Sequence, residues 1–450
     1  MFYQRFVSDG LAHYSYLVGD GGRGVVIDPH RSVDVYLAAA TKAGLDIIAV
    51  LETHRHEDFV VGSTALAQAT GAPIWHADAH LDYAYGQAVR DGQTWQLGPL
   101  KLEAMHTPGH TLGSMSYVLR AEGDAPWMAF PGDLLFAGDV GRTDFYGEER
   151  LQETTGLLYD SLHRRVLPLG DGVLLCPAHG AGSACGASVA DREPTTLGLE
   201  RALNPQLQLP SREAFISEVA RMLPFPPYFH GVEERNLRPA KACPNAVSML
   251  AMEEVEASRA RIVDLRGELA FASAHMPDAL SMPPGTLGRY GGWFLEQEGP
   301  LVLVGAGATE AARLLCWMGY DNVLGELAGG VEAYLRSGRE PAQTRTASVQ
   351  ELCRLLDGDA KPWILDVRSD EERKASAIPD AQGIDLRYLL DRASEVPQDH
   401  DVYVFCGSGR RAMVAVSSLQ RREDYGNLIV VLGGFAGWQS RSCPVQRSGA

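Results

Sequence analysis

The sequence predicts an α/β protein with a layered sandwich at its amino end, followed by two smaller α/β domains with parallel sheets. Short runs rich in Val, Ile and Leu end at Gly or Asp and alternate with helical stretches, which indicates sheets covered by helices. The carboxyl-terminal half repeats itself once. The amino-terminal half carries His and Asp side chains directly after several of its strand-like runs.

The length and charge of the chain exclude several classes of protein. With 450 residues the chain is long enough for about three domains. Its 40 basic and 57 acidic residues give a net charge of −17 without a basic stripe, so we expect no binding to nucleic acid. It contains neither a run of about 18 apolar residues nor a signal peptide, so we expect a cytoplasmic protein without a membrane segment.

The cysteines favour a reducing compartment. There are seven of them, far apart, at positions 176, 185, 243, 316, 353, 406 and 443. An odd number at these spacings matches neither a disulfide framework nor a CxxC zinc site. We therefore expect free thiols.

The first domain is expected to span residues 1–204. It opens with a hairpin over 14–29 around a Gly-rich turn. A buried strand at 47–54 follows, and then a helix over 60–71 that ends at Gly71. This alternation predicts an α/β layered sandwich.

A proline-rich segment follows the first domain. Residues 205–245 contain seven prolines, which fit neither a long helix nor a central strand. We interpret the segment as a linker that contains one helix, in the stretch SREAFISEVARML.

The remaining chain is a duplicated domain, over 246–342 and 343–450. IVDLR in the first copy recurs as ILDVR in the second, so that Asp264 and Asp366 lie 102 residues apart. AGGVEAYLRSG likewise returns as LGGFAGWQSRS. A period near 100 is too long for a solenoid repeat and is close to the commonest domain size.

The first candidate site is a set of His and Asp residues at four predicted strand ends. Side chains at the carboxyl ends of strands project into the crevice where α/β proteins bind ligands. Histidine and carboxylate ligands without thiolate suit Zn, Fe or Mn, and two His with one carboxylate suit non-heme Fe(II). The set therefore predicts a metal site; it consists of His54, His56, Asp58, His110, Asp133 and His179.

These segments resemble the metallo-β-lactamase superfamily, whose motif is HxHxDH followed by a distant His, Asp and His. The resemblance covers about residues 1–200 and implies an αββα sandwich. One position departs from the pattern: Phe59 stands where the superfamily has a His that binds a second metal. This substitution argues for a single ion.

The surrounding sequence resembles the persulfide dioxygenases, relatives of the glyoxalase-type thioester hydrolases. The similar segments are TPGHTLGS, GDLLFAGDVGRTDF and PAHG. The resemblance implies one Fe(II) per chain, held by His54, His110 and Asp133. Three ligands leave three positions open, enough for a persulfide sulfur and O2 together, whereas a four-ligand zinc site offers one open place and no redox chemistry.

Further residues are expected around this ion. His56, Asp58 and His179 would orient the ligands or support a water molecule. Arg142 in GRTDF would either organise the substrate or Asp144, or form a structural pair with Asp144. Cys185 would be either a gating or persulfide-accepting thiol near the iron or an inert, packed cysteine. The candidates around the ion are thus His56, Asp58, His179, Arg142, Asp144 and Cys185.

The second candidate site is Cys406. It follows a strand-like run and opens a Gly-bearing loop before a helix that begins near Arg410 and Arg411. Backbone N–H groups, the helix start and the arginines all favour negative charge, which makes Cys406 a candidate thiolate nucleophile. The segment resembles the rhodanese sulfurtransferases, whose active loop is Cys, four residues, Arg, and the resemblance implies that Cys406 carries the transferred sulfur.

The first copy departs from this pattern. Gly305 stands where the second copy has Cys406, and Glu310 takes the place of a basic residue. We expect this copy to be catalytically silent, with a scaffolding or interface role, and the sequence leaves a homo-oligomer open.

The whole chain resembles the bacterial persulfide dioxygenase–sulfurtransferase fusions. The resemblance implies Fe(II)-dependent oxidation of glutathione or coenzyme A persulfide by O2 to sulfite and thiol. Cys406 would pass sulfane sulfur to sulfite to give thiosulfate, or run the reverse reaction. The alternatives are a zinc thioester hydrolase of the glyoxalase II type with an appended sulfurtransferase domain, and a sulfur carrier with no enzymatic first site.

Overall fold

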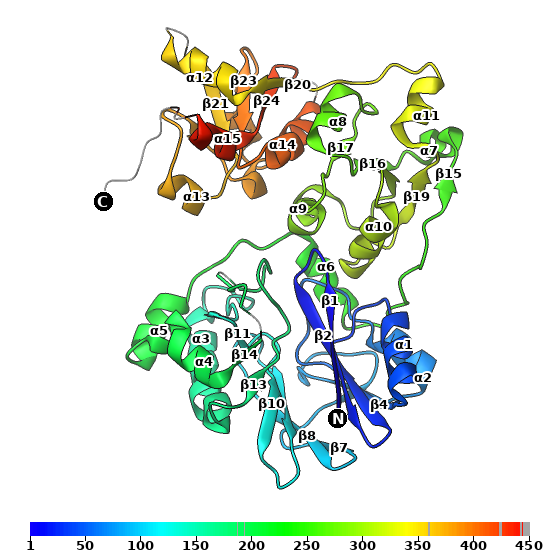
Figure 1. The fold of residues 1–450 in the computed structure, drawn as a ribbon, viewed down its shortest axis with the longest axis vertical. Helices are drawn as coiled ribbons and strands as arrows, with labels where there is room; N and C mark the ends of the chain where they lie inside the picture. Colours follow the sequence, from blue (N-terminus) through cyan, green and yellow to red (C-terminus); the bar gives the residue numbers. More distant parts are fainter. Residues whose placement is uncertain (187, 193, 359–360, 423–424, 442, 444–450) are drawn as a thin grey trace. The chain divides into compact units, whose positions relative to one another are not determined.

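The computed structural model divides into two compact units (Figure 1). It describes residues 1–450 except 187, 193, 359–360, 423–424, 442 and 444–450. The first unit consists of Met1–Asn245 with Arg313–Gly319, and the second of Ala246–Ala312 with Tyr320–Ala450. Among the described residues, no helix has the length and hydrophobicity needed to cross a bilayer.

The first unit contains two six-stranded sheets. In the first sheet the strands follow the order β1 to β6. Strands β1, β2 and β3 pair antiparallel, with β2 and β3 forming the predicted hairpin, whereas β3 to β6 pair parallel. Its strands are β1 Phe2–Ser8, β2 His13–Asp20, β3 Arg23–Ile27, β4 Asp46–Leu51, β5 Ile74–His76 and β6 Gln87–Ala88. The second sheet has the order β14-β13-β10-β9-β8-β7. Its strands are β7 Thr94–Leu97, β8 Leu100–His106, β9 Met115–Arg120, β10 Pro126–Phe130, β13 Leu174–Leu175 and β14 Thr195–Thr196, with β11 Leu135–Phe136 and β12 Asp139–Val140 as a separate pair.

A shared core holds the two sheets together. Alternate side chains of both sheets, such as Tyr16 of β2 and Tyr117 of β9, belong to one buried cluster. On the first sheet, buried residues of α1 Asp34–Ala43 and α2 Ser63–Thr70 form another cluster with β2 and β4. On the second sheet, α3 Leu151–Ser161, α4 Leu197–Leu203 and α5 Arg212–Val219 contribute Leu158, Leu197 and Phe215 to a third. The predicted αββα class is therefore confirmed.

The proline-rich segment 205–245 contains more structure than the single helix expected from its sequence. After a 3₁₀ turn at Pro205–Gln208 come α5 and a second helix, α6 Tyr228–Arg235. Three prolines lie just before α6, which is compatible with helix formation because the first helical turn needs no backbone donor there. Phe229 is fully buried, and Asn236 donates hydrogen bonds to the backbone of His56 and Phe59. The segment is thus part of the first unit.

The second unit contains two parallel five-stranded sheets of identical order, β15-β19-β18-β16-β17 and β20-β24-β23-β21-β22. The first consists of β15 Met249–Leu250, β16 Arg261–Asp264, β17 Leu280–Ser281, β18 Leu301–Val304 and β19 Val323–Leu327, with helices α7 Met252–Ser258, α8 Glu268–Ser273, α9 Leu287–Phe294 and α11 Gly330–Arg336. Helix α10 Ala308–Trp317 begins in this unit, and its part from Arg313 onward is assigned to the first unit. The second consists of β20 Arg345–Ser348, β21 Trp363–Asp366, β22 Gln382–Gly383, β23 Val402–Phe405 and β24 Leu428–Leu432, with helices α12 Val349–Asp357, α13 Asp370–Ala375, α14 Arg410–Gln420 and α15 Gly434–Ser440. Two parallel α/β folds of one topology agree with the predicted fold class.

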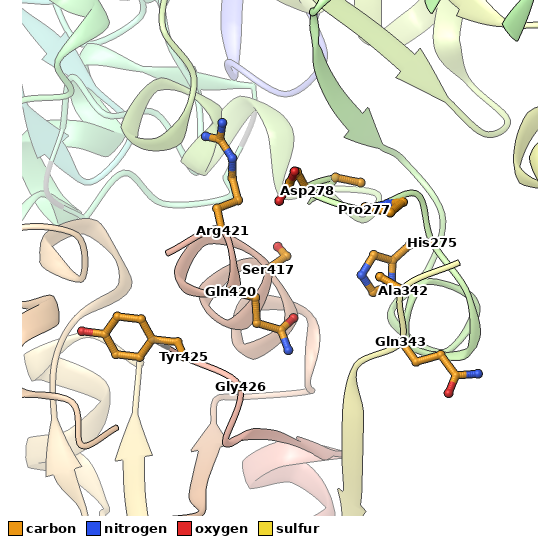
Figure 2. A pocket seen from close by; sticks show the side chains of 11 residues that line it. His275, Pro277, Asp278, Ala342, Gln343, Ser417, Gln420, Arg421, Tyr425 and Gly426 are labelled. Carbon is orange, nitrogen blue, oxygen red and sulfur yellow. The ribbon is translucent and has the colours of Figure 1, made fainter. Parts of the chain in front are cut away.

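The two copies of the second unit meet along α14. The backbone N–H of Ser281 in β17 donates to the hydroxyl of Ser417 in α14 at 3.0 Å. Beside this contact is a cavity of about 290 Å³ whose lining includes His275 from one copy and Gln420 and Arg421 from the other (Figure 2). Its lining does not include Cys406.

The prediction that the cysteines are free thiols is wrong for four of them. The structure pairs Cys243 with Cys316 and Cys353 with Cys443, with Cα atoms 5.9 Å apart in each pair. Partners 73 and 90 residues apart along the chain are brought together by the fold, which sequence spacing does not reveal. Cys176, Cys185 and Cys406 are free and buried.

Candidate functional site

The first candidate site brings together His54, His110 and Asp133. His54 lies just after β4, His110 lies in the loop between β8 and β9, and Asp133 follows β10. Nε2 of His54 lies 3.8 Å from Asp133 Oδ2, and Nε2 of His110 lies 3.5 Å from the same oxygen. One potential ligand atom from each residue lies within 4.8 Å of the other two, and all three side chains are buried.

In both histidines a hydrogen bond at Nδ1 leaves the lone pair of Nε2 free on the side that faces the other ligands. Nδ1 of His110 donates to the backbone oxygen of Arg142 at 2.9 Å. Thr53 donates its hydroxyl proton to Asp28, so Nδ1 of His54 must donate to Thr53 Oγ1 at 2.9 Å. Both Nε2 atoms are then unprotonated in the neutral rings. These nitrogens and Asp133 Oδ2 are buried without a hydrogen-bond partner in the described part of the chain.

Unpaired buried polar atoms are costly, and three of them converging on one point call for an explanation. A metal cation supplies it, because neutral imidazole nitrogens and a carboxylate oxygen are metal ligands. The residues present therefore fit a metal ion.

His179 lies between two carboxylates beside this cluster. Its Nδ1 is 2.7 Å from Asp133 Oδ1 and its Nε2 is 2.8 Å from Asp58 Oδ2. Burial lowers the pKa of His179, but the negative charges of Asp133 and Asp58 outweigh burial and raise its pKa well above the ordinary value. His179 and Asp58 thus bond to each other and, through His179, to Asp133.

His56 is also in the cluster but faces elsewhere. Its Nε2 lies 3.1 Å from Asp28 Oδ1, and its ring centre is 4.0 Å from that of His54. Phe59, fully buried, packs against it at 4.5 Å and against His13 at 3.8 Å between ring centres. An apolar ring therefore occupies the space where the superfamily pattern has a metal-binding histidine.

Cys185 lies next to Asp58 and His179, with one potential ligand atom of each within 4.8 Å of the others. The side chain is fully buried, and burial raises the pKa of its thiol well above the ordinary value. Cys185 is thus close to the site and favours the protonated form.

Arg142 has all five of its side-chain N–H groups bonded to protein. Two go to Asp144, at 2.7 Å each, and the other three go to backbone oxygens. The acceptors of those three are Ala184, Leu223 and Pro224. This arrangement favours the structural pair over substrate binding, with Arg142 acting on the site through the backbone oxygen that holds His110.

One residue of the site was not singled out in the sequence. Glu57 is fully buried, and its Oε2 lies 3.6 Å from Nε2 of His110 and 4.0 Å from Nε2 of His54. It occupies a variable position of the HxHxDH pattern, so the pattern gave no reason to select it.

The second candidate site is built around Cys406, which follows β23. Its Sγ accepts hydrogen bonds from the backbone N–H of Gly409 at 3.1 Å and of Ala412 at 3.4 Å. These donors belong to the loop and to the first turn of α14. They stabilise negative charge on sulfur, as a thiolate or a persulfide.

Of the two predicted arginines, Arg411 lies at the loop and Arg410 contacts the first copy. An Nη2 of Arg411 lies 3.0 Å from the point where a Cβ on Gly407 would be. Arg411 also forms two hydrogen bonds to Glu372, at 2.6 and 2.7 Å. Arg410, by contrast, donates to the backbone oxygen of Pro284 at 3.4 Å.

The first copy has a different geometry at the matching position. Gly305 follows β18 as Cys406 follows β23, and it has a φ of +108°. A Cβ at Gly305 would lie 2.9 Å from Cγ of Arg266, which is itself bonded to Asp264. A side chain at position 305 would therefore require Arg266 to shift.

Comparison with known proteins matches two parts of the chain to known families. A family model of the metallo-beta-lactamase superfamily matches residues 8–181, and one of the rhodanese-like domain matches residues 348–441. The mitochondrial persulfide dioxygenase ETHE1 of Bos taurus is 32% identical over 240 residues, which are 50% of this chain and 83% of that protein. The human protein of the same name is 31% identical over 248 residues, 52% of this chain and 86% of that protein.

Two more distant relatives extend the comparison. Hydroxyacylglutathione hydrolase GloC of Haemophilus influenzae is 27% identical over 214 residues, 43% of this chain and 91% of that protein. The crystal structure of a metallo-beta-lactamase from Staphylococcus aureus subsp. aureus COL matches 72% of this chain and 98% of its own, with a TM-score of 0.66 and 28% identity. The chain therefore belongs to the metallo-beta-lactamase superfamily and, within it, to the persulfide dioxygenase family, with a rhodanese-like domain at its carboxyl end.

Proposed function

We propose that the chain is a bifunctional enzyme of sulfide oxidation. The first site oxidises a low-molecular-weight persulfide, and the Cys406 site transfers sulfane sulfur. The observation that carries the first activity is the convergence of two buried imidazole nitrogens and one carboxylate oxygen, all without hydrogen-bond partners among the described residues. This donor set suits one Fe(II) per chain, held by His54, His110 and Asp133.

The overall oxidation is balanced without a further reductant. The persulfide RSSH, O2 and water give RSH and sulfurous acid, so the outer sulfur is oxidised by four electrons and O2 is reduced. Fe(II), when bound, supplies a redox-active centre at which sulfur and O2 meet. Glutathione and coenzyme A persulfides are the substrates we propose, and the cytoplasm is the compartment.

The chain's own residues prepare this site. His110 and His54 are held by hydrogen bonds at Nδ1, which keeps Nε2 available. His179, between Asp133 and Asp58, holds a proton on the outer side of the site and orients the Asp133 carboxylate. The complete burial of these groups excludes bulk water, which strengthens their electrostatic interactions.

The second activity uses Cys406 as nucleophile. Its thiolate attacks the outer sulfur of a persulfide, the S–S bond breaks, RSH leaves, and Cys406 keeps the sulfur as a persulfide. Sulfite then attacks that sulfur, giving thiosulfate and the Cys406 thiolate; the reverse reaction uses the same groups. The N–H groups of Gly409 and Ala412 stabilise the charge on sulfur in each state.

The experiment for the first activity is O2 uptake with glutathione persulfide and coenzyme A persulfide, with the metal content measured on the same preparation. We expect one iron per chain and uptake that stops when iron is removed. Absence of O2 uptake by the iron-loaded protein would overturn the proposal.

The thioester hydrolase is the second candidate, supported by the similarity to hydroxyacylglutathione hydrolase GloC. It would need two zinc ions per chain and cleavage of S-lactoylglutathione. Phe59 stands against it, because its ring fills the space between His13 and His56. A sulfur carrier without an enzymatic first site would bind no metal at all, so the same metal measurement separates the three functions.

A further inference from the structure

We propose that the second unit carries an anion-binding site in which Arg259, Arg261 and Arg421 hold a doubly charged oxyanion. The three arginines line one cavity of about 390 Å³. Arg259 follows α7, Arg261 begins β16, and Arg421 follows α14 of the other copy. The lining of this cavity includes neither Cys406 nor Gly305, so the site is distinct from the sulfur-transfer loop and from its counterpart in the first copy.

Arg261 carries a charge that its surroundings do not fully satisfy. Its Nη1 donates to the backbone oxygen of Asp278 at 2.7 Å, but its Nε is buried without a hydrogen-bond partner in the described part of the chain. Burial and the charge of Arg421 lower the pKa of Arg261 to about 9, although Asp278 and Glu296 act to raise it. The guanidinium still carries its charge at neutral pH. A buried charged donor without an acceptor is costly, and an oxygen of a bound anion would supply that acceptor.

The charges that line the cavity favour an anion over a cation. Three arginines face two carboxylates, Asp278 and Glu296, so one positive charge is left over. Among the described residues, no carboxylate forms an ion pair with any of the three arginines. The apolar residues Ile262, Phe294 and Leu301 line the same cavity, and a partly apolar wall strengthens the attraction between the arginines and an anion. Arginine side chains also match the planar and tetrahedral arrangement of oxyanion oxygens.

The fold does not require an arginine at the start of β16. In the second copy β21 has the same place in a sheet of the same order, and it begins with Trp363. Arg261 and Trp363 lie 102 residues apart, which is the interval of the duplication, and both are half-buried. The charge at this position is therefore a feature of the first copy alone, as a site that only this copy forms would need.

The cavity lies at the opposite end of α14 from the sulfur-transfer loop. Ala412, whose N–H bonds to Cys406, is in the first turn of this helix, and Arg421 follows its last turn. The helix has 11 residues, so its ends lie about 16 Å apart. Pro277, Asp278 and Arg421 line both this cavity and the one shown in Figure 2. An anion bound here would therefore contact both copies without occupying the Cys406 loop.

The test measures anion binding by the full-length chain with isothermal titration calorimetry. The probes are inorganic phosphate and thiosulfate, which carry the same charge but represent phosphate groups and sulfur oxyanions. All titrations use the Cys406→Ser background, so that thiosulfate cannot transfer sulfur to the chain. Arg261→Gln and Arg421→Gln each remove one charge and keep a polar side chain. Arg336→Gln is the matched control, because Arg336 in α11 is an exposed arginine that does not line the cavity.

We expect each cavity variant to weaken binding of at least one anion by about tenfold, because each removes a charged hydrogen-bond donor. Arg336→Gln should bind as the Cys406→Ser chain does. The anion with the larger loss identifies the source of the ligand, and equal losses assign the site to both. The inference is overturned if neither anion binds, or if both cavity variants keep the full affinity for both anions. If Arg261→Gln does not fold, Arg421→Gln decides, because the Arg421 side chain is exposed.

Discussion

Nδ1 of His179 lies 2.7 Å from Oδ1 of Asp133, the carboxylate oxygen that does not face His54 and His110. This hydrogen bond occupies one oxygen of Asp133 and leaves Oδ2 for an ion. The other ring nitrogen is held by Asp58 at 2.8 Å, so the ring cannot rotate without losing a buried bond. His179 therefore fixes the orientation of a proposed ligand without facing the centre itself.

The first prediction concerns this orienting bond. His179→Asn should weaken Fe(II) binding by roughly 10- to 100-fold, because Asp133 loses the group that orients it. The affinity is measured by chelator competition. His163→Asn, a histidine stacked on Tyr159, is the control and should bind Fe(II) as the wild type does. Equal affinity in both variants would contradict the role proposed for His179.

The second prediction separates the two activities. His110→Ala or Asp133→Ala should lose bound iron and lower persulfide-dependent O2 uptake by more than about 100-fold, since each removes a proposed ligand. Thiosulfate formation from supplied persulfide and sulfite should continue in both variants. O2 uptake at the wild-type rate would show that these residues do not hold the ion.

The third prediction concerns the sulfur-transfer loop. Cys406→Ser should abolish thiosulfate formation and leave O2 uptake unchanged. Arg411→Lys should reduce transfer by about tenfold, because lysine cannot reproduce the paired hydrogen bonds to Glu372. The assay is thiosulfate production from glutathione persulfide and sulfite. Undiminished transfer in Cys406→Ser would refute the assignment.

The fourth prediction is the thiol count. A denatured, unreduced sample should contain three reactive thiols, corresponding to Cys176, Cys185 and Cys406. Prior reduction should raise the count to all seven cysteines. Seven thiols before reduction would mean that neither disulfide forms and would contradict the two pairings.

The fifth prediction concerns pH and the pair of Arg411 and Glu372. Burial raises the pKa of Glu372, but the hydrogen bonds and charge of Arg411 outweigh burial and lower it from 4.5 to about 2. Because the pKa of Glu372 is lower in the folded state than in the unfolded state, its ionised carboxylate stabilises the folded protein at pH values above the unfolded-state pKa. This contribution is lost as the pH falls from 4.5 toward 2. Glu372→Gln should therefore lower the melting temperature at pH 7 and have progressively less effect between pH 4.5 and pH 2.

The size of this effect should be small. The Glu372 side chain is 40% exposed, so solvent screens the pair and the loss is about 1 kcal/mol or less. Unfolding curves of the wild type and the variant, recorded at several pH values, provide the measurement. A stability difference that grows as the pH falls would contradict the predicted direction of the pH dependence.

The fold class could be predicted from the sequence because its signals are local. The Val- and Ile-rich runs became strands, and the helix predicted over 60–71 forms as α2, with Gly71 in the left-handed conformation at its end. The His and Asp residues could be selected because they follow strands whose ends meet at one edge.

The features that could not be predicted from the sequence depend on tertiary structure. The direction of the Glu57 side chain is set by the path of the chain after β4, and no residue type around it marks that direction. The disulfides join partners 73 and 90 residues apart, whose approach only the tertiary fold determines. The second helix of segment 205–245 lies directly after prolines, which indicate a break in a sequence pattern although the fold tolerates them.

The backbone at Gly305 has an evolutionary consequence. Changing this single codon to cysteine would place a Cβ 2.9 Å from Cγ of Arg266, in a left-handed conformation that side chains rarely adopt. Arg266 cannot retreat freely, because it is bonded to Asp264 and to the backbone of Ala274. A cysteine at this position would therefore require Arg266 and the loop to shift, so one substitution would not by itself rebuild the geometry that surrounds Cys406.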